Sequence, residues 1–441
     1  MKRIKITKGV IILFLFISSV LSAQTKVEDV KSFTLNNGMK FFVLEDHSIP
    51  NANMYLFFKV GSRNEYPGIT GLSHFFEHMM FNGAKKYGPK MFDKVMEAAG
   101  GANNAYTNKN LTVYTDWFPS GSIETMFDLE ADRIGHLALD DKMVKSERGV
   151  VISERITIYE NYNQAFLSDQ VDAVAYMAHP YRWPVIGYES DIKNWKKSDL
   201  QQYFDTYYAP NNAVVVMVGD ITPDEVKTLA KKYLEPIPSR KPPRPIHTKE
   251  PPQMGEKRMI VRKKVSSPHI MITYHVPETR SKDYYALDIL NSILGDGKSS
   301  RLYRSIVSDK QLAVSISTSM PYALDPTLFY FYAVCVRDVK VEDLEAAIYR
   351  EIDKIVKEGV NQRELQKVKN NKLANFYRSM STINGKANSI GTYEIYFGSC
   401  KKLFNAPMEY KKVTPGDIER VAAKYLKKSN RTVGILKSKE E

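Results

Sequence analysis

Cysteines are scarce in this chain of 441 residues. Cys335 and Cys400 are the only two, and no Cys-x-x-Cys pair occurs, which excludes a disulfide scaffold and a thiolate metal or redox motif. Whether the two pair is left open, because the sequence does not give their geometry. With 43% hydrophobic and 26% charged residues, the chain is neither disordered nor collagen-like, and its length leaves room for two or three globular domains.

Long apolar runs are also missing, apart from a short one near the N-terminus. Residues 10–21 are mostly apolar and follow four basic residues, and Leu21-Ser22-Ala23 at their end resembles a small-residue cleavage site. This order predicts a secretory signal peptide over residues 1–23 and an exported protein, periplasmic or otherwise extracytoplasmic. The run is shorter than the roughly 20 residues of a membrane-spanning helix, so we expect no stable membrane span; an uncleaved signal anchor is the alternative.

The chain has no dense run of basic residues, although its formal net charge is +13. Without the four basic residues of the predicted signal peptide the net charge is +9, and the remaining lysines are spread along the chain. A solvated basic surface explains this distribution. A nucleic-acid-binding surface would need aromatic residues interleaved with basic ones, and no such cluster occurs, so we expect no nucleic-acid partner.

A cluster of prolines divides the chain near its middle. Seven of the 21 prolines lie within residues 236–252, which predicts a stiff, extended linker over residues 236–255. The flanking halves, residues 24–235 and 256–441, resemble each other. Residues 54–60 match residues 270–276 at an offset of 216, and a second pattern near the end of each half matches at an offset of 218. We interpret the halves as diverged copies of one domain.

Both halves contain strand-like and helix-like patterns. Apolar runs predict strands over residues 40–45, 54–60, 112–117, 214–218, 270–275 and 328–335. Apolar residues at helical spacing predict helices over residues 71–81, 91–99, 122–137 and 341–357. The predicted fold class is α+β, with two tandem homologous domains of packed helix and sheet layers.

The strongest chemical signal is the sequence His74-Phe75-Phe76-Glu77-His78. It lies in a predicted helix, where residues four apart are about 40° apart around the axis, so both imidazoles can reach one metal ion. Glu77 lies beside the same ion, where it can take a proton from a metal-bound water. This is the inverted zinc-peptidase motif. The apolar flanks make the helix largely buried, and buried polar side chains need partners.

Two histidines do not complete a catalytic zinc site, which usually has three protein ligands. Glu147 and Glu154 are seven residues apart, so they lie about two turns apart on one helix face. One carboxylate can bind the metal while the other holds a ligand imidazole in place. Spacing alone does not say which does which.

Beyond these residues, the chain resembles a known family over nearly its whole length. The matching segments are Asn36-Asn37-Gly38-Met39, Gly61-Ser62-Arg63-Asn64-Glu65, Gly71-Leu72-Ser73, Met80-Phe81-Asn82-Gly83, Asn104-Ala105-Tyr106-Thr107, Pro184-Val185-Ile186-Gly187 and Tyr208-Ala209-Pro210-Asn211-Asn212. Together with the histidine motif, they are similar to the pitrilysin family of inverzincins, in the branch of the mitochondrial processing peptidases and their bacterial relatives.

The resemblance assigns roles that spacing leaves open. It implies one zinc ion per chain on His74, His78 and Glu154, with Glu77 as general base and Glu147 supporting a ligand. It also implies substrate-binding residues Asn104, Ala105 and Thr107 on an edge strand, where an extended peptide docks by main-chain pairing. From the residues alone, Asn103-Asn104 after two glycines predicts a turn instead.

The second half lacks the metal motif. At the 216 offset, the motif positions hold Leu290, Ile293 and Leu294, which favours an apolar core. In the family this half often supplies an Arg and, seven residues on, a Tyr that hold the substrate. Alignment places Val307 and Val314 there, unless it has slipped past Tyr303 or Arg304. We therefore expect a metal-free homologous subunit to supply the Arg/Tyr clamp in a heterodimer.

These observations predict an exported zinc endopeptidase whose two domains enclose a cleft. It would hydrolyse peptides or extended, unfolded protein segments through a zinc-activated water. The alternative is a non-catalytic scaffold or assembly subunit that keeps the peptidase fold.

Overall fold

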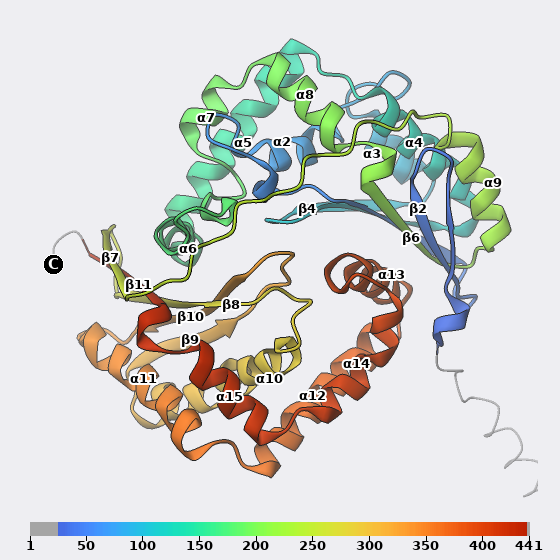
Figure 1. Ribbon diagram of the computed structural model, residues 1–441. Coiled ribbons are helices and arrows are strands. Elements are labelled where there is room, and N and C mark those ends of the chain that lie inside the picture. Colours follow the sequence, from blue (N-terminus) through green and yellow to red (C-terminus); the bar gives the residue numbers. More distant parts are fainter. Residues whose placement is uncertain (1–24, 439–441) are drawn as a thin grey trace, which may run out of the picture.

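The computed structural model describes residues 25–438 (Figure 1). The predicted signal peptide lies outside the described residues. The described part consists of two α+β domains, each with one sheet, which confirms the predicted fold class. Within it, no helix is both long and apolar enough to cross a bilayer.

The first domain has a six-stranded sheet in the order β1-β2-β6-β3-β5-β4. Its strands are β1 (Lys31–Thr34), β2 (Lys40–Glu45), β3 (Asn51–Phe58), β4 (Ala102–Thr107), β5 (Thr112–Pro119) and β6 (Ala213–Gly219). β2 and β6 are parallel, and the other neighbours are antiparallel. The apolar run of β6 is fully buried, as predicted for a central strand. The patterns did not predict β1 or β4.

Most helices of the first domain cover one face of this sheet (Figure 1). They are α2 (Leu72–Met79), α3 (Met91–Ala98), α4 (Ile123–His136), α5 (Asp141–Asn161), α6 (Asn163–Ala175), α7 (Glu189–Asn194), α8 (Lys197–Tyr207) and α9 (Pro223–Tyr233). The predictions over residues 71–81, 91–99 and 122–137 are confirmed to within two residues at each end. The apolar stripes that predicted these helices form the main core of the domain.

The second domain has a five-stranded sheet in the order β7-β11-β8-β10-β9. Its strands are β7 (Lys257–Arg262), β8 (His269–Val276), β9 (Ala313–Ser319), β10 (Thr327–Cys335) and β11 (Arg431–Lys437). Its α-helices are α10 (Tyr284–Gly295), α11 (Val341–Glu358), α12 (Gln362–Ser379), α13 (Ile383–Thr392), α14 (Lys401–Lys412) and α15 (Pro415–Tyr425). Between α9 and β7, the segment with the prolines contains neither helix nor strand.

Strand register shows that the two sheets are copies of one another. Leu56 of β3 pairs with Val215 of β6, and Ile272 of β8 pairs with Val433 of β11. The two pairs are related by the offsets of 216 and 218 that the sequence shows. The parallel pair β2 and β6 likewise corresponds to β7 and β11. The interpretation of the halves as diverged copies therefore extends to single residue pairs.

In each domain, one helix packs against the sheet of the other domain. Helix α6 of the first domain packs on β11 and β8, while α13 of the second packs on β6 and β3 (Figure 1). Glycines permit both approaches. A Cβ on Gly391 of α13 would lie 2.2 Å from the ring of Phe57, and a Cβ on Gly434 of β11 would lie 2.3 Å from Val171 of α6. The two domains are thus joined by two equivalent, closely packed contacts.

Cys335 and Cys400, for which the sequence leaves disulfide pairing open, do not form a disulfide. Both are free and buried, Cys335 in the core of the second domain and Cys400 in the apolar cluster between the domains. Burial raises the pKa of the Cys335 thiol to about 11, so it stays protonated at neutral pH. We conclude that both cysteines serve as apolar packing residues.

The two contact glycines give a stability prediction. Gly391→Ala and Gly434→Ala should each lower the free energy of unfolding by about 1–3 kcal/mol, because the new methyl group has no room. Urea denaturation of the purified variants measures this. Gly149→Ala is the matched control. Gly149 lies in α5 with open space beside it, so the substitution should stabilise the chain by about 0.5–1 kcal/mol. Equal stability of all three variants would contradict the packing argument.

Candidate metal centre

Helix α2 is buried in the core of the first domain on every side but one. Leu72, Phe75, Phe76 and Met79 are completely buried, so the helix cannot rotate without exposing them. The remaining side carries His74, Glu77 and His78, which are only partly buried. The apolar residues of the motif therefore fix the direction in which its polar residues point.

The start of α2 is fixed by a buried carboxylate. Glu65 accepts the backbone N–H of Gly71 and that of Ser73, each at 2.7 Å. Gly71 has a φ of 91°, which favours glycine, and a Cβ there would lie 2.5 Å from the carbonyl oxygen of Ile186. Burial raises the pKa of the Glu65 carboxyl group to about 8, and the two backbone hydrogen bonds partly counteract that effect. The helix thus begins at Leu72, two positions before His74.

Helix α5 supplies the two carboxylates and packs against α2. The Asp140 side chain caps its N-terminus by accepting the backbone N–H of Lys142 at 2.9 Å and that of Met143 at 3.2 Å. Glu147 and Glu154 lie two turns apart on the side that faces the histidines. The sequence predicted this arrangement from the spacing of seven residues.

Three side chains converge on one point between the helices. His74 Nε2 is 3.7 Å from Glu154 Oε1, and His78 Nε2 is 3.4 Å from Glu154 Oε2. One donor atom from each of the three residues lies within 4.8 Å of the others. Donor atoms of a tetrahedral zinc site are roughly 3.3 Å apart, as bond lengths of about 2.0–2.1 Å require. Two imidazole nitrogens and a carboxylate at these separations fit a zinc ion.

Glu147 lies on the other side of the His78 ring. Its Oε1 is 2.8 Å from His78 Nδ1, and its Oε2 accepts a hydrogen bond of 2.7 Å from the Asn82 side chain. This arrangement places a proton on Nδ1 and leaves Nε2 facing Glu154. The sequence analysis gave no role to Asn82. No helical spacing marks it, because α2 ends at Met79 and Asn82 lies in the turn that follows.

The two histidines differ in their electrostatic environment. Burial lowers the pKa of His74 to about 4, with a contribution from nearby His78. Burial acts in the same direction on His78, but hydrogen bonds to Glu147 and Glu154 outweigh it and raise its pKa to about 9. The same contacts lower the pKa of both carboxyl groups. The cluster therefore offers anionic oxygens and one proton that a cation would displace.

Glu77 lies beside this cluster without joining it. Burial raises the pKa of its carboxyl group, and the side chain and backbone of Thr107 partly counteract that effect. A carboxylate of raised pKa is a better proton acceptor than an exposed one. Thr107 is the last residue of β4, so the strand ends against the candidate base.

Strand β4 forms the edge of the first sheet. Among the described strands it pairs only with β5, so its other side has unpaired backbone groups. Asn104 and Ala105 lie in this strand, opposite Thr115 and Tyr114, and the turn that Asn103-Asn104 predicts from the residues alone is wrong. Pairing with β5 overrides the local turn preference of asparagine. All three predicted substrate-binding residues therefore share one free edge.

A groove of about 550 Å³ runs between this edge and helices α2 and α3. Its lining includes Glu77, His78 and Glu147 of the site, and the other lining residues are Phe81, Asn82, Lys90, Asp93, Lys94, Glu97, Asn103, Asn104 and Ala105. Four charged residues at the start and along α3 were not predicted to line the site: Lys90, Asp93, Lys94 and Glu97. No motif marks them, because they reach the site through tertiary packing alone.

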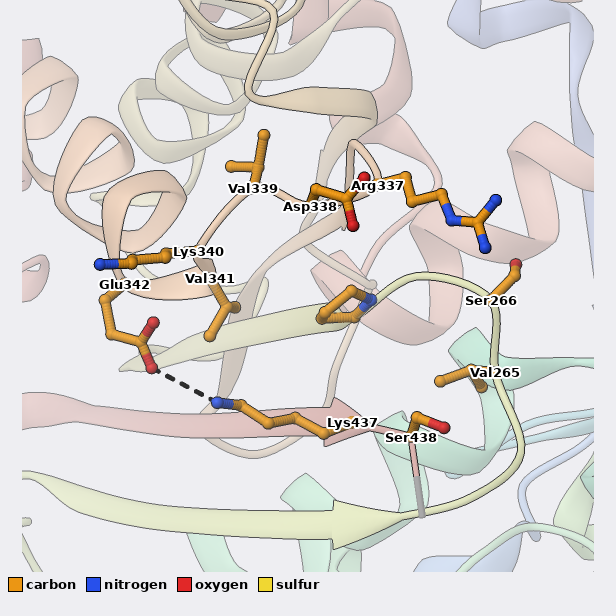
Figure 2. Close-up of a pocket in the computed structure, with 11 residues that line it drawn as sticks. Val265, Ser266, Arg337, Asp338, Val339, Lys340, Val341, Glu342, Lys437 and Ser438 are labelled. Atoms are coloured by element: carbon orange, nitrogen blue, oxygen red, sulfur yellow. Dashed lines mark hydrogen bonds and ion pairs between the residues drawn. The ribbon is translucent and has the colours of Figure 1, made fainter. Parts of the chain in front are cut away.

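The second domain has a hollow of similar size, shown in Figure 2. It is about 500 Å³ in volume and lies between the end of β10, the start of α11 and the end of β11. Lys437 and Glu342 form an ion pair of 3.5 Å across it. No histidine or cysteine lines it, so it does not resemble the cluster on α2 and α5.

Comparisons with known proteins identify the family of the chain. Residues 40–188 match the family described as "Insulinase (Peptidase family M16)", and residues 194–372 match "Peptidase M16 inactive domain". The chain is 31% identical to "Zinc protease PqqE" of Helicobacter pylori over 97% of both chains. It is 25% identical to "Mitochondrial-processing peptidase subunit beta" of Lentinula edodes, over 89% of this chain and 86% of the other.

A solved structure is similar over nearly the same length. The crystal structure of a protease from Helicobacter pylori superimposes with a TM-score of 0.89 at 31% identity. The match covers 92% of this chain and 99% of the other. The likeness therefore extends across both domains and the contacts between them.

Proposed function

Because the chain belongs to the M16 peptidase family, we propose that it is an exported zinc endopeptidase that hydrolyses peptides or extended, unfolded protein segments. The observation that carries this proposal is the convergence of His74, His78 and Glu154, with Glu77 beside them in a groove. A free strand edge borders the same groove, and an extended peptide can add to it by main-chain hydrogen bonds.

Each residue of the centre has a distinct task in this proposal. His74, His78 and Glu154 hold one zinc ion per chain, and Glu147 fixes the ring of His78 through Nδ1. When bound, zinc polarises a carbonyl oxygen and lowers the pKa of a water molecule. Glu77 takes the proton of the attacking water at its carboxylate and returns it to the leaving amine. Asn104 and Ala105 orient the peptide, which brings its scissile bond to Glu77.

Two features of the sequence support the proposed location of the protein and its proposed partner subunit. The basic and apolar order of residues 1–23 supports export to the periplasm or another extracytoplasmic space. Val307 packs partly buried against the core of the second domain, and Val314 on β9 is 63% exposed. Neither side chain can donate a hydrogen bond to a substrate. We therefore propose a heterodimer in which a metal-free homologous subunit supplies an Arg and a Tyr.

One observation favours the alternative of a non-catalytic scaffold subunit. The description matched by residues 194–372 is that of an inactive domain. The chain nevertheless keeps His74, Glu77, His78, Glu147 and Glu154 in one place, whereas a scaffold has no need of them. Zinc content per purified chain separates the two proposals, since a scaffold would bind none.

Glu77→Gln tests the proposed base. The amide keeps the size and the hydrogen bonds of the side chain but cannot accept the proton, so peptide hydrolysis should fall by about 10²- to 10⁴-fold. Zinc content, measured by atomic absorption, should remain one per chain. Undiminished turnover in this variant would remove Glu77 from the reaction.

The two carboxylates of α5 should differ in their effect on zinc. Glu154→Gln removes a ligand and should abolish stoichiometric zinc binding, whereas Glu147→Gln should weaken the affinity by about 10- to 100-fold. Competition with a chelator measures both. Glu160→Gln is the control, because Glu160 is an exposed residue of the same helix. Reversed affinities would show that the roles of Glu147 and Glu154 are exchanged.

The proposed heterodimer predicts low activity of the chain alone. Adding a metal-free homologue that carries the Arg and Tyr should raise the rate of peptide hydrolysis by at least about tenfold, because the substrate is then held from both sides. Titrating candidate homologues into a peptidase assay measures this. Full activity of the lone chain, unchanged by every homologue, would rule out the shared clamp.

A further inference from the structure

One loop of the second domain contacts the strand that borders the candidate metal centre. The loop, residues 320–326, joins β9 to β10. The backbone N–H of Leu324 donates to Asn110 Oδ1 at 3.3 Å, and Asn110 Nδ2 donates to the carbonyl oxygen of Tyr322 at 3.5 Å. Asn110 lies in the turn between β4 and β5 and is 4% exposed. A single buried side chain thus binds the loop through both its donor and its acceptor.

Neighbouring side chains hold the same loop in place. The Tyr181 hydroxyl donates to Asn110 Oδ1 and accepts the backbone N–H of Asp325 at 3.3 Å. The Asp325 carboxylate lies 2.5 Å from Arg63 Nη2 and 3.3 Å from His179 Nε2. Because these groups are largely buried, their polar atoms are poorly satisfied if the loop moves away. The loop therefore has one preferred position on the first domain.

The turn that receives the loop is itself rigid. Asn108 Oδ1 accepts the backbone N–H of Asn110 at 2.7 Å and that of Leu111 at 2.9 Å. The hydroxyl of Tyr396, from the second domain, donates to the same oxygen at 3.4 Å. On the other side, the backbone of Gly61 lies so close that a Cβ would be 2.4 Å from the carbonyl oxygen of Asn108. The turn cannot shift without displacing one of these neighbours.

The turn leads directly to the candidate base. Thr107 precedes it, ends β4 and pairs with Thr112 of β5, with 3.4 Å between the two hydroxyl oxygens. The same Thr107 lies against Glu77. A displacement of the turn would therefore move both the substrate edge and the contact with the base.

From these contacts we infer that Asn110 is a positioning residue for peptide hydrolysis. It ties the 320–326 loop of the metal-free domain to the end of β4, and so holds Thr107 against Glu77 and the strand edge in register with the metal centre. The second domain thus contributes to the reaction from outside the metal centre. The inference rests on the proposed peptidase function.

Asn110→Leu tests the inference in the full chain, assayed with any homologous partner that activity requires. Leucine keeps the branched shape of the asparagine side chain but makes none of its hydrogen bonds to Tyr322, Leu324 and Tyr181. We expect kcat to fall, KM to rise, and kcat/KM to fall by about 10- to 100-fold, because misplacement of about 1 Å has effects of this size. Zinc content should stay unchanged. Amide hydrogen exchange of residues 102–111 should become faster, as measured by mass spectrometry.

Two further variants separate positioning from general destabilisation. Asp325→Ala removes the contacts of the loop with Arg63 and His179. Like Asn110→Leu, it should lower kcat, raise KM and make amide hydrogen exchange of residues 102–111 faster. Asn430→Leu is the matched control, since Asn430 Nδ2 donates to the carbonyl oxygens of His275 at 2.9 Å and Tyr425 at 2.8 Å within the second domain. It should lower stability but leave kcat and KM per folded chain, and the exchange of residues 102–111, unchanged.

The outcomes distinguish this inference from the proposed function. Wild-type kinetics and exchange in Asn110→Leu and Asp325→Ala would overturn the inference, as would the same kinetic losses in Asn430→Leu. If the zinc-loaded wild type hydrolyses no peptide, the proposed function fails. Amide hydrogen exchange then tests whether Asn110 holds β4 in place. Faster exchange of residues 102–111 in Asn110→Leu but not in Asn430→Leu would then support the positional link, and equal exchange would overturn it.

Discussion

The burial of helix α2 in the core of the first domain is the constraint on which the candidate centre depends. Its apolar residues leave one side for polar groups, and that side carries both histidines and Glu77. The neighbouring elements are arranged around that side. Helix α5 brings Glu154 to the ring nitrogens and Glu147 behind His78. Strand β4 closes the groove with its free edge. Core packing and metal-site geometry are therefore one property of α2.

Much of this could be predicted from the sequence, because the signals are local. The pattern His74-x-x-Glu77-His78 contains both the helical spacing and the ligand types. The spacing of Glu147 and Glu154 likewise predicts that they lie on one helix face. Spacing does not show which of them faces the Nε2 atoms of the two histidines. The offsets of 216 and 218 indicate the duplication from sequence alone, and the strand pairs of Leu56 and Ile272 reproduce them.

The remainder depended on contacts between distant segments. Asn104 has the local preferences of a turn residue, and only pairing with β5 makes it part of a strand. The contact of Thr107 with Glu77 joins residues 30 positions apart, and the bonds of Asn110 to the 320–326 loop join two domains. Neither has a periodicity or a motif. The charged residues along the groove were missed for the same reason, since side chains such as Asp93 reach it only through the packing of α3.

The exchange of α6 and α13 between the sheets has a consequence for the ancestry of the chain. In a protein made of a single copy, no helix of a second domain would cover the sheet, and the exchanged helix would have no sheet to pack against. Two identical copies could satisfy each other only by associating about a twofold axis, as symmetric homodimers do. We infer that the duplicated gene descends from such a dimer, because the two copies still exchange equivalent helices. Within one chain the two copies need not keep the same residues, and α10 carries Leu290, Ile293 and Leu294 at the motif positions, all buried in the second core.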